Sequence, residues 1–193
     1  MPAPPSPDLL AAARRGSGEA RDALIDAWLP SVVTWCARLG GPRVDPEDAA
    51  HDVFIVVLTR LDGLREPERF PSWVFGITRR VLAQHRRRAW WSRWVPGAVV
   101  DAVDPGRDPD EVAALSETSR RVQAALEELP EAQRTVLILC DLEERADSEV
   151  ADLLDCPLGT VRSRLRLARE RFRRVAPRYR LGADVVSIAG GRR

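Results

Sequence analysis

The chain has 193 residues, 45% of them hydrophobic, which is enough to bury one ordinary core or two small ones. Its 30 basic and 29 acidic residues leave a net charge of +1, which by itself neither favours nor excludes a nucleic-acid partner. No apolar run approaches the length of about 18 residues that a membrane span needs, and the N-terminus lacks the apolar stretch of a secretory signal, so a soluble protein without membrane insertion is expected.

Three helices are predicted in the first third of the chain. A short one covers 8–15, and a longer one covers 19–39, where apolar residues recur at helical spacing. Because Pro30 lies inside the second pattern, we expect a kink or a helix break there. The third helix begins after Asp45, a capping residue followed by a first-turn proline, and extends to Leu61.

This third helix is apolar around most of its circumference. The side expected to close the domain's own core holds Ala50, Phe54, Val57 and Leu61. Val53, Ile55 and Val56 then need a second surface, which another protein would supply. The alternative is a helix buried entirely within its own domain.

After a turn at 62–67, a fourth helix is predicted from Pro71 to about Ala89. Its core side is expected to hold Val74, Ile77, Val81 and Leu82. The other face combines arginines with tryptophans: Arg79, Arg80, Arg86, Arg87, Arg88 and Arg93 beside Trp73, Trp90, Trp91 and Trp94. Such a surface suits an unstacked nucleic-acid strand, because cations follow the backbone and rings stack on bases. The alternative is that Trp73 is a core residue and the later tryptophans pack against the following segment.

Proline, glycine and aspartate concentrate at 96–110, which indicates a flexible acidic linker, assigned to 96–115, between two helical domains. Four more helices follow it, at 116–129, 131–142 and 148–154, and from 158 onward. Val150, Ala151 and Leu154 are expected to face inward.

The last two helices have the pattern of a helix-turn-helix. The long second helix carries one apolar stripe, formed by Val161, Leu165, Ala168 and Phe172. Its remaining positions are mostly arginine. In a helix-turn-helix the second helix enters the major groove of DNA and presents its first turns to the base edges.

Charge is strongly segregated along the chain. Residues 1–95 hold 14 Arg and 11 acidic residues (+3), 96–118 hold one and six (−5), 119–156 hold four and ten (−6), and 157–193 hold 11 and two (+9). The basic C-terminal segment is typical of a surface that neutralises phosphates, although a solvated helix face is the simpler alternative.

Three cysteines and two histidines offer little site chemistry. The cysteines cannot form a closed disulfide set and fit no zinc spacing, so buried, unreactive thiols in a reducing cytoplasm are expected. His51 is expected on a helix surface. No phosphate-binding loop or nucleophile arrangement is present, so we expect no enzymatic activity, no cofactor, no metal and no small-molecule substrate.

Four motifs together resemble one family. The segments 129–134 (LPEAQR) and 157–165 (PLGTVRSRL) resemble the sigma-four domain of extracytoplasmic-function (ECF) sigma factors of the sigma-70 family. The segments 45–54 (DPEDAAHDVF) and 70–79 (FPSWVFGITR) resemble the sigma-two domain of the same family. A lone helix-turn-helix is a weak signal, whereas two motif sets in the family's order are specific.

The resemblance implies an all-α factor that binds core RNA polymerase and directs it to promoters, with an anti-sigma factor as a separate partner. The implied organisation is a sigma-two domain at 1–95, the acidic linker at 96–115, a sigma-four domain at 116–176 and a C-terminal tail at 177–193. The residues implied in polymerase binding are Asp48, Asp52, Val53, Ile55 and Val56. Those implied in holding the melted minus-ten element are Arg65, Arg69, Phe70, Trp73, Arg79 and Arg80. Those implied in reading the minus-thirty-five element are Thr160, Arg162, Ser163, Arg164, Arg166 and Arg169.

Two departures from the family pattern are visible. Arg80 stands where the family commonly has Asn, and the charged segment 143–147 replaces an apolar turn, which predicts a looser turn. The competing functional hypothesis is an autonomous helix-turn-helix regulator that binds duplex DNA without polymerase.

Overall fold

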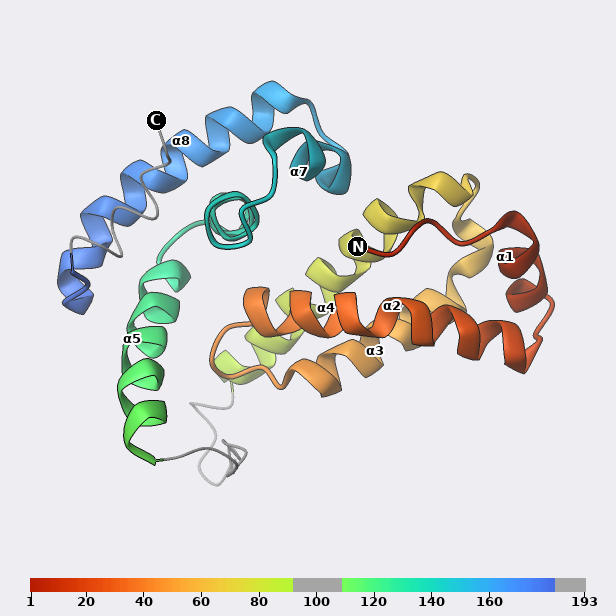
Figure 1. The fold of residues 1–193 in the computed structure, drawn as a ribbon, viewed down its shortest axis with the longest axis horizontal. Coiled ribbons are helices and arrows are strands. Elements are labelled where there is room, and N and C mark those ends of the chain that lie inside the picture. Colours follow the sequence, from red (N-terminus) through yellow and green to blue (C-terminus); the bar gives the residue numbers. More distant parts are fainter. Residues whose placement is uncertain (92–108, 183–193) are drawn as a thin grey trace. The chain divides into compact units, whose positions relative to one another are not determined.

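The computed structural model describes residues 1–91 and 109–182, and every regular element within them is helical. The chain divides into two compact units, an N-terminal unit (Met1–Val99) and a C-terminal unit (Val100–Arg193). The predicted all-α fold with two small helical domains is therefore confirmed. Figure 1 shows the helices of each unit in sequence colours.

The N-terminal unit is a bundle of four helices, in which α2 packs against α1, α3 and α4, and α3 also packs against α4. Two short 3₁₀ turns, η1 and η2, join α3 to α4. The elements are α1 (Pro7–Arg14), α2 (Gly18–Leu39), α3 (Pro46–Thr59), η1 (Leu61–Gly63), η2 (Pro67–Arg69) and α4 (Phe70–Trp91).

The predicted helix start at Asp45 is confirmed in detail. Its carboxylate accepts hydrogen bonds from the backbone N–H groups of Glu47 and Asp48, each at 2.9 Å. Two of the donors that a helix N-terminus leaves unpaired are thereby satisfied. Serines cap the two preceding helices in the same way, Ser6 for α1 and Ser17 for α2.

The expected break at Pro30 is wrong, because α2 continues through it as one helix of 22 residues. The cost of the missing hydrogen bond is offset by the buried face of this helix. Trp28 and Trp35 are each 1% exposed, and their rings meet Phe70 and Phe75 edge-on, with centroids 5.1 and 4.9 Å apart. Such aromatic pairs contribute about 0.5–1.5 kcal/mol each beyond the area they bury.

The C-terminal unit is built around α6 and α8, which pack against each other, with α7 against α8. Its elements are α5 (Pro109–Glu127), α6 (Glu131–Leu137), the π-turn η4 (Ile138–Leu142), α7 (Asp147–Leu154), α8 (Leu158–Val175) and the 3₁₀ turn η5 (Ala176–Tyr179). In α7 the third inward residue is Leu153 and not Leu154, which is half-buried.

The helical structure of the C-terminal unit extends beyond the predicted boundaries at both ends. Helix α5 begins at Pro109, so the end of the predicted linker at 109–115 is helical, and its first part at 96–108 lies outside the described residues. The predicted tail begins too early. η5 packs against α5 and α8, the Tyr179 hydroxyl donates to a Glu128 carboxylate oxygen at 2.9 Å, and Leu181 is 9% exposed. Residues 183–193 lie outside the description.

Two of the three cysteine thiols stay protonated at neutral pH and well above it. Burial raises the pKa of Cys36 to about 12, and burial together with Asp147 and Asp141 does the same for Cys140. At pH 8 such a thiol is thiolate in only about one molecule in 10,000, and the thiolate is the nucleophile.

We therefore expect iodoacetamide at pH 8 to modify the half-buried Cys156 first and to leave Cys36 and Cys140 unmodified in the native protein. Peptide mass mapping before and after unfolding in urea measures this order. Modification of Cys36 in the native protein as fast as that of Cys156 would contradict the assignment.

Candidate nucleic-acid interface

Helices α7 and α8 form the predicted helix-turn-helix. Helix α7 ends at a C-cap residue, Asp155, whose backbone is left-handed with φ of 48°, and α8 starts at Leu158. This sharp reversal lets α7 pack across α8. The geometry places the first turns of α8, which include Thr160 and Arg162, at the end that a helix-turn-helix presents to DNA.

Helix α8 has one buried and one exposed side. The predicted stripe of Val161, Leu165, Ala168 and Phe172 is buried, and Val175 extends it by one turn. On the exposed side the structure places Arg162, Ser163 and Arg166 in solvent, with Thr160 and Arg164 half-buried. The Ser163 hydroxyl donates to the carbonyl of Thr160 at 3.0 Å, so its remaining capacity is as an acceptor.

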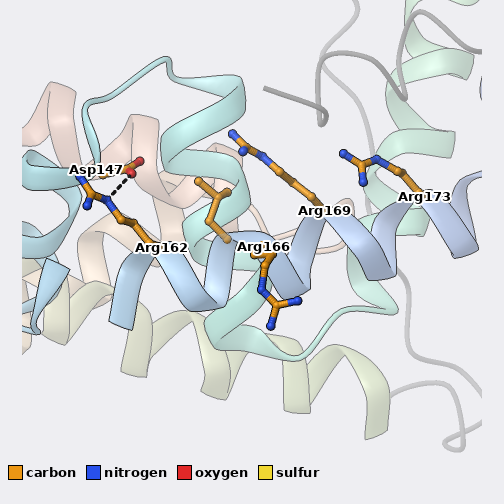
Figure 2. Close-up of a pocket in the computed structure, with 6 residues that line it drawn as sticks. Asp147, Arg162, Arg166, Arg169 and Arg173 are labelled. Carbon is orange, nitrogen blue, oxygen red and sulfur yellow. Dashed lines mark ion pairs between the residues drawn. The ribbon is translucent and has the colours of Figure 1, made fainter. Parts of the chain in front are cut away.

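A hollow of about 270 Å³ runs beside α8 and is strongly basic. Figure 2 shows its arginines projecting from successive turns of α8, with Arg162 turned toward Asp147 at the start of α7. The lining residues are Asp147, Arg162, Leu165, Arg166, Arg169 and Arg173. The ion pair between Arg162 and Asp147 is 3.4 Å long and two-thirds exposed on the arginine side, so its energetic contribution is small.

Arg169 differs from its neighbours and corrects the sequence prediction. Its guanidinium donates to both carboxylate oxygens of Asp141, at 3.0 and 2.7 Å, and the Asp141 side chain is only 4% exposed. The hydrogen bond to Asp141 raises the pKa of Arg169 further above its ordinary value. Arg169 therefore holds α8 against the π-turn η4.

The charged turn at 143–147, for which a looser turn was expected, carries an ion pair and several hydrogen bonds. Arg145 pairs with Glu143 at 2.6 Å, and its backbone N–H donates to the carbonyl of Leu139 at 3.1 Å. The backbone N–H of Ala146 donates to the Glu149 carboxylate at 3.3 Å. Charged side chains thus supply the contacts that an apolar turn would obtain by packing.

The basic residues of the N-terminal unit are less uniform than the sequence suggests. Arg65, Arg69 and Arg80 are exposed, and Arg79 is half-buried. Arg69 also pairs with Glu66 at 2.8 Å.

The aromatic predictions divide in two. Phe70 is fully buried against Trp28, so it is a core residue and the expected contact with DNA is wrong for this conformation. Trp73 is half-buried, and its ring centroid lies 6.0 Å from that of Phe70.

The structure describes only part of the predicted tryptophan cluster. Trp90 and Trp91 belong to the last turn of α4, and Arg93 and Trp94 lie outside the described residues. Arg86 was predicted on the basic face, but its guanidinium donates to the carbonyl of Leu39 at 2.7 Å and so caps the end of α2.

On α3, the predicted core residues Ala50, Phe54 and Val57 are buried, as is Leu61 just beyond it. The predicted polymerase surface is partly different. Ile55 is 52% exposed, Asp48 is exposed and Val56 is half-buried. Val53 is fully buried, so its assignment to a partner surface is wrong.

Asp52 is held by a histidine that the sequence did not connect to it. The imidazole Nε2 of His85 lies 2.8 Å from a carboxylate oxygen of Asp52, across 33 residues of chain. A pairing between two helices at that separation leaves no periodic signal. The other histidine, His51, is exposed, as predicted.

Within 1–91 and 109–182, no group of three or more histidine, cysteine, aspartate or glutamate side chains could hold a metal ion. None of the described helices is long and apolar enough to cross a membrane.

Together these features define a two-domain, all-helical DNA-binding protein with a basic recognition helix. Residues 24–92 match the model of the family described as sigma-70 region 2, and residues 119–172 match the model described as sigma-70, region 4. The chain belongs to the sigma-70 family and is an ECF sigma factor.

Curated relatives agree with this assignment. The ECF RNA polymerase sigma factor SigW of Bacillus subtilis is 24% identical over 83% of this chain and 91% of its own length. The ECF RNA polymerase sigma-E factor of Escherichia coli is 28% identical, over 81% and 86%. SigE of Mycolicibacterium smegmatis is 31% identical over 79% of this chain and 60% of its own length.

Two solved structures share the fold, each at 21% sequence identity. One is CnrH in complex with the cytosolic domain of CnrY, with a TM-score of 0.58 over 86% of this chain and 94% of that chain. The other is the sigma factor RpoE of Bartonella quintana in complex with the anti-sigma factor NepR, with a TM-score of 0.53 over 80% and 94%.

Proposed function

We propose that this protein is an alternative sigma factor that binds core RNA polymerase and directs it to a specific set of promoters. The observation that carries the proposal is the presence of region 2 and region 4 in one chain, with a buried stripe and an exposed arginine side on α8. In this proposal the protein catalyses no reaction itself and acts in the cytoplasm, where the polymerase is.

The recognition helix would read the minus-thirty-five element. Arg162, Arg164 and Arg166 supply planar guanidinium donors that match guanine O6 and N7 or a phosphate. Ser163 and Thr160 add hydroxyl contacts near the helix start. Arg169 is left out of this surface because its Nε and Nη2 donors are both occupied by the Asp141 carboxylate.

The N-terminal unit would hold the melted minus-ten strand. The exposed arginines Arg65, Arg69 and Arg80 can follow the phosphate backbone, and the half-buried Trp73 would offer a ring on which a base can stack. Opening duplex costs a few kcal/mol per unstacked base, which these contacts would offset.

The polymerase surface is proposed on α3, around Asp48, Ile55 and Val56. An isoleucine that is 52% exposed on a helix with a buried opposite face suits burial against a protein partner. The two structural neighbours were solved with partner proteins, one of them an anti-sigma factor, and we propose that a separate anti-sigma factor also regulates this protein.

The central test is transcription with purified core polymerase. We expect a promoter-specific transcript from a template library only when this protein is added, and retention of core polymerase on the immobilised protein. Specific duplex binding by the protein alone, with neither transcript nor polymerase retention, would instead establish the autonomous regulator.

A single substitution tests the polymerase surface. We expect Ile55→Asp to weaken binding of core polymerase by about 2 kcal/mol, roughly 30-fold, because a charge would be buried at the centre of an apolar contact. Thermal stability should stay unchanged, since the side chain is exposed in the free protein. Leu29→Asp is the matched control, because Leu29 is 39% exposed on α2. Equal losses in both variants, or none in either, would contradict the assignment.

A further inference from the structure

The turn between α3 and α4 carries two of the arginines proposed to hold the melted strand, Arg65 and Arg69. It is built from two 3₁₀ pieces of three residues each, η1 and η2, so it has few hydrogen bonds of its own. Leu61 and Leu64 are buried beneath it, at 2% and 4% exposure. Without further support, a turn of this kind retains much of its conformational freedom.

The support comes from the other end of the unit. Arg14, the last residue of α1, donates from Nε to the carbonyl of Leu61 at 3.2 Å and from Nη2 to the carbonyl of Leu64. One planar guanidinium thus joins both ends of η1, across 47 and 50 residues of chain. Its donors are fixed relative to one another, so they also fix the spacing of the two carbonyls.

Arg14 is itself held in place. The buried Leu10 and Ala13 dock α1 into the bundle, and α1 contacts both α2 and η1. The carbonyl of Ala13 accepts a hydrogen bond from Nε of Arg21 on α2 at 3.1 Å. The rigid helix α2 is therefore connected through the end of α1 to the turn.

We propose that Arg14 is a positioning residue for promoter recognition, which holds the turn at 61–69 in the form that presents Arg65 and Arg69 to the melted strand. This proposal rests on the proposed function of the turn. Its basis is the two-carbonyl contact and the exposure of both presented arginines. Arg14 itself need not touch DNA or polymerase.

Its neighbour provides a matched control. Arg14 and Arg15 are both exposed and both lie at the end of α1, so Arg14→Gln and Arg15→Gln each remove one positive charge from the same place. Only the first also removes the contact with the two carbonyls. Arg14→Lys keeps the charge but replaces the fixed fork with a single ammonium group.

The experiment uses the full-length chain bound to core polymerase and a fork-junction DNA whose minus-ten element is single-stranded. We expect Arg14→Gln to weaken binding of this DNA about tenfold, because the turn must then be ordered at the moment of binding. Arg15→Gln should bind as the wild type does, and Arg14→Lys should be nearly as weak as Arg14→Gln. Polymerase affinity should stay within error of the wild type, and the melting temperature should fall by no more than a few degrees, since only two hydrogen bonds are lost.

Amide hydrogen exchange of the free protein gives a readout independent of promoter binding. We expect faster exchange at 61–69 in Arg14→Gln than in Arg15→Gln, with protection of α3 and α4 unchanged. Equal behaviour of the two variants in exchange or in DNA binding overturns the proposal, and so does a general loss of folding or of polymerase affinity in Arg14→Gln. If the wild-type holoenzyme itself ignores the single-stranded element, the proposed function of the turn fails, whatever the exchange data show.

Discussion

Replacing Arg169 with alanine is expected to destabilise the C-terminal unit by about 3 kcal/mol. The change leaves the Asp141 carboxylate, which is 4% exposed, without the guanidinium that donates to both its oxygens. Removing one partner of a buried ion pair costs about 3–5 kcal/mol. The lower value applies here because the Arg169 side chain is 27% exposed to solvent.

The chain carries its own probes for this experiment. All six tryptophans lie at or before residue 94, and the single tyrosine is Tyr179, so tryptophan fluorescence reports on the N-terminal unit. In urea titrations we expect Arg169→Ala to shift the part of the circular-dichroism signal that belongs to the C-terminal unit, while the tryptophan transition stays in place.

Arg173→Ala is the control for charge, since Arg173 lines the same hollow and makes no ion pair within the described residues. It should change stability by no more than about 0.5 kcal/mol. The double variant Asp141→Leu with Arg169→Met should be more stable than Arg169→Ala, because no buried charge is left unpaired. Unchanged stability of Arg169→Ala, with a loss of promoter affinity, would return Arg169 to the DNA surface.

The second large effect is expected on the recognition helix. Arg166→Ala should weaken binding of the holoenzyme to its minus-thirty-five duplex by about 1–3 kcal/mol if Arg166 reads a guanine, and discrimination should relax at that one base pair. If Arg166 instead contacts a phosphate, the substitution should weaken binding to all promoter sequences alike. The slope of log K against log salt concentration should then fall by about one. The side chain is 71% exposed, and its pair with Glu170 is long at 3.8 Å, so folding should be unaffected.

The measurement requires the preferred promoter, which selection from a genomic library with the reconstituted holoenzyme provides. Binding of single-base variants of that promoter at two salt concentrations then separates base reading from phosphate contact. Arg173→Ala, two turns further along α8, is the control for general basicity. If Arg166→Ala and Arg173→Ala have the same small effect, α8 does not enter the groove with its first turns.

Much of this protein was predictable from local sequence. Helix positions followed from apolar spacing and from capping residues such as Asp45, since these depend on contacts within a few residues. The expected helix break at Pro30 failed for the opposite reason, whereas the missed helix start at Pro109 is a local signal that the linker-like composition outweighed. Pro30 stays helical because Trp28 and Trp35 bury the helix around it, so packing outweighs the local penalty. A proline at 109 opens α5, where the composition indicated a linker.

The sequence by itself determined the helical architecture, the two-domain order, the arginine-rich recognition helix and the family. Only the tertiary structure decided which members of each motif are free to act. It placed Phe70 and Val53 in the core, committed Arg169 to Asp141 and Arg86 to the end of α2, and brought Arg14 to the turn before α4. The physical reason is that a motif specifies residue type and spacing along one helix. A side chain at the border between two faces is assigned by partners that lie tens of residues away.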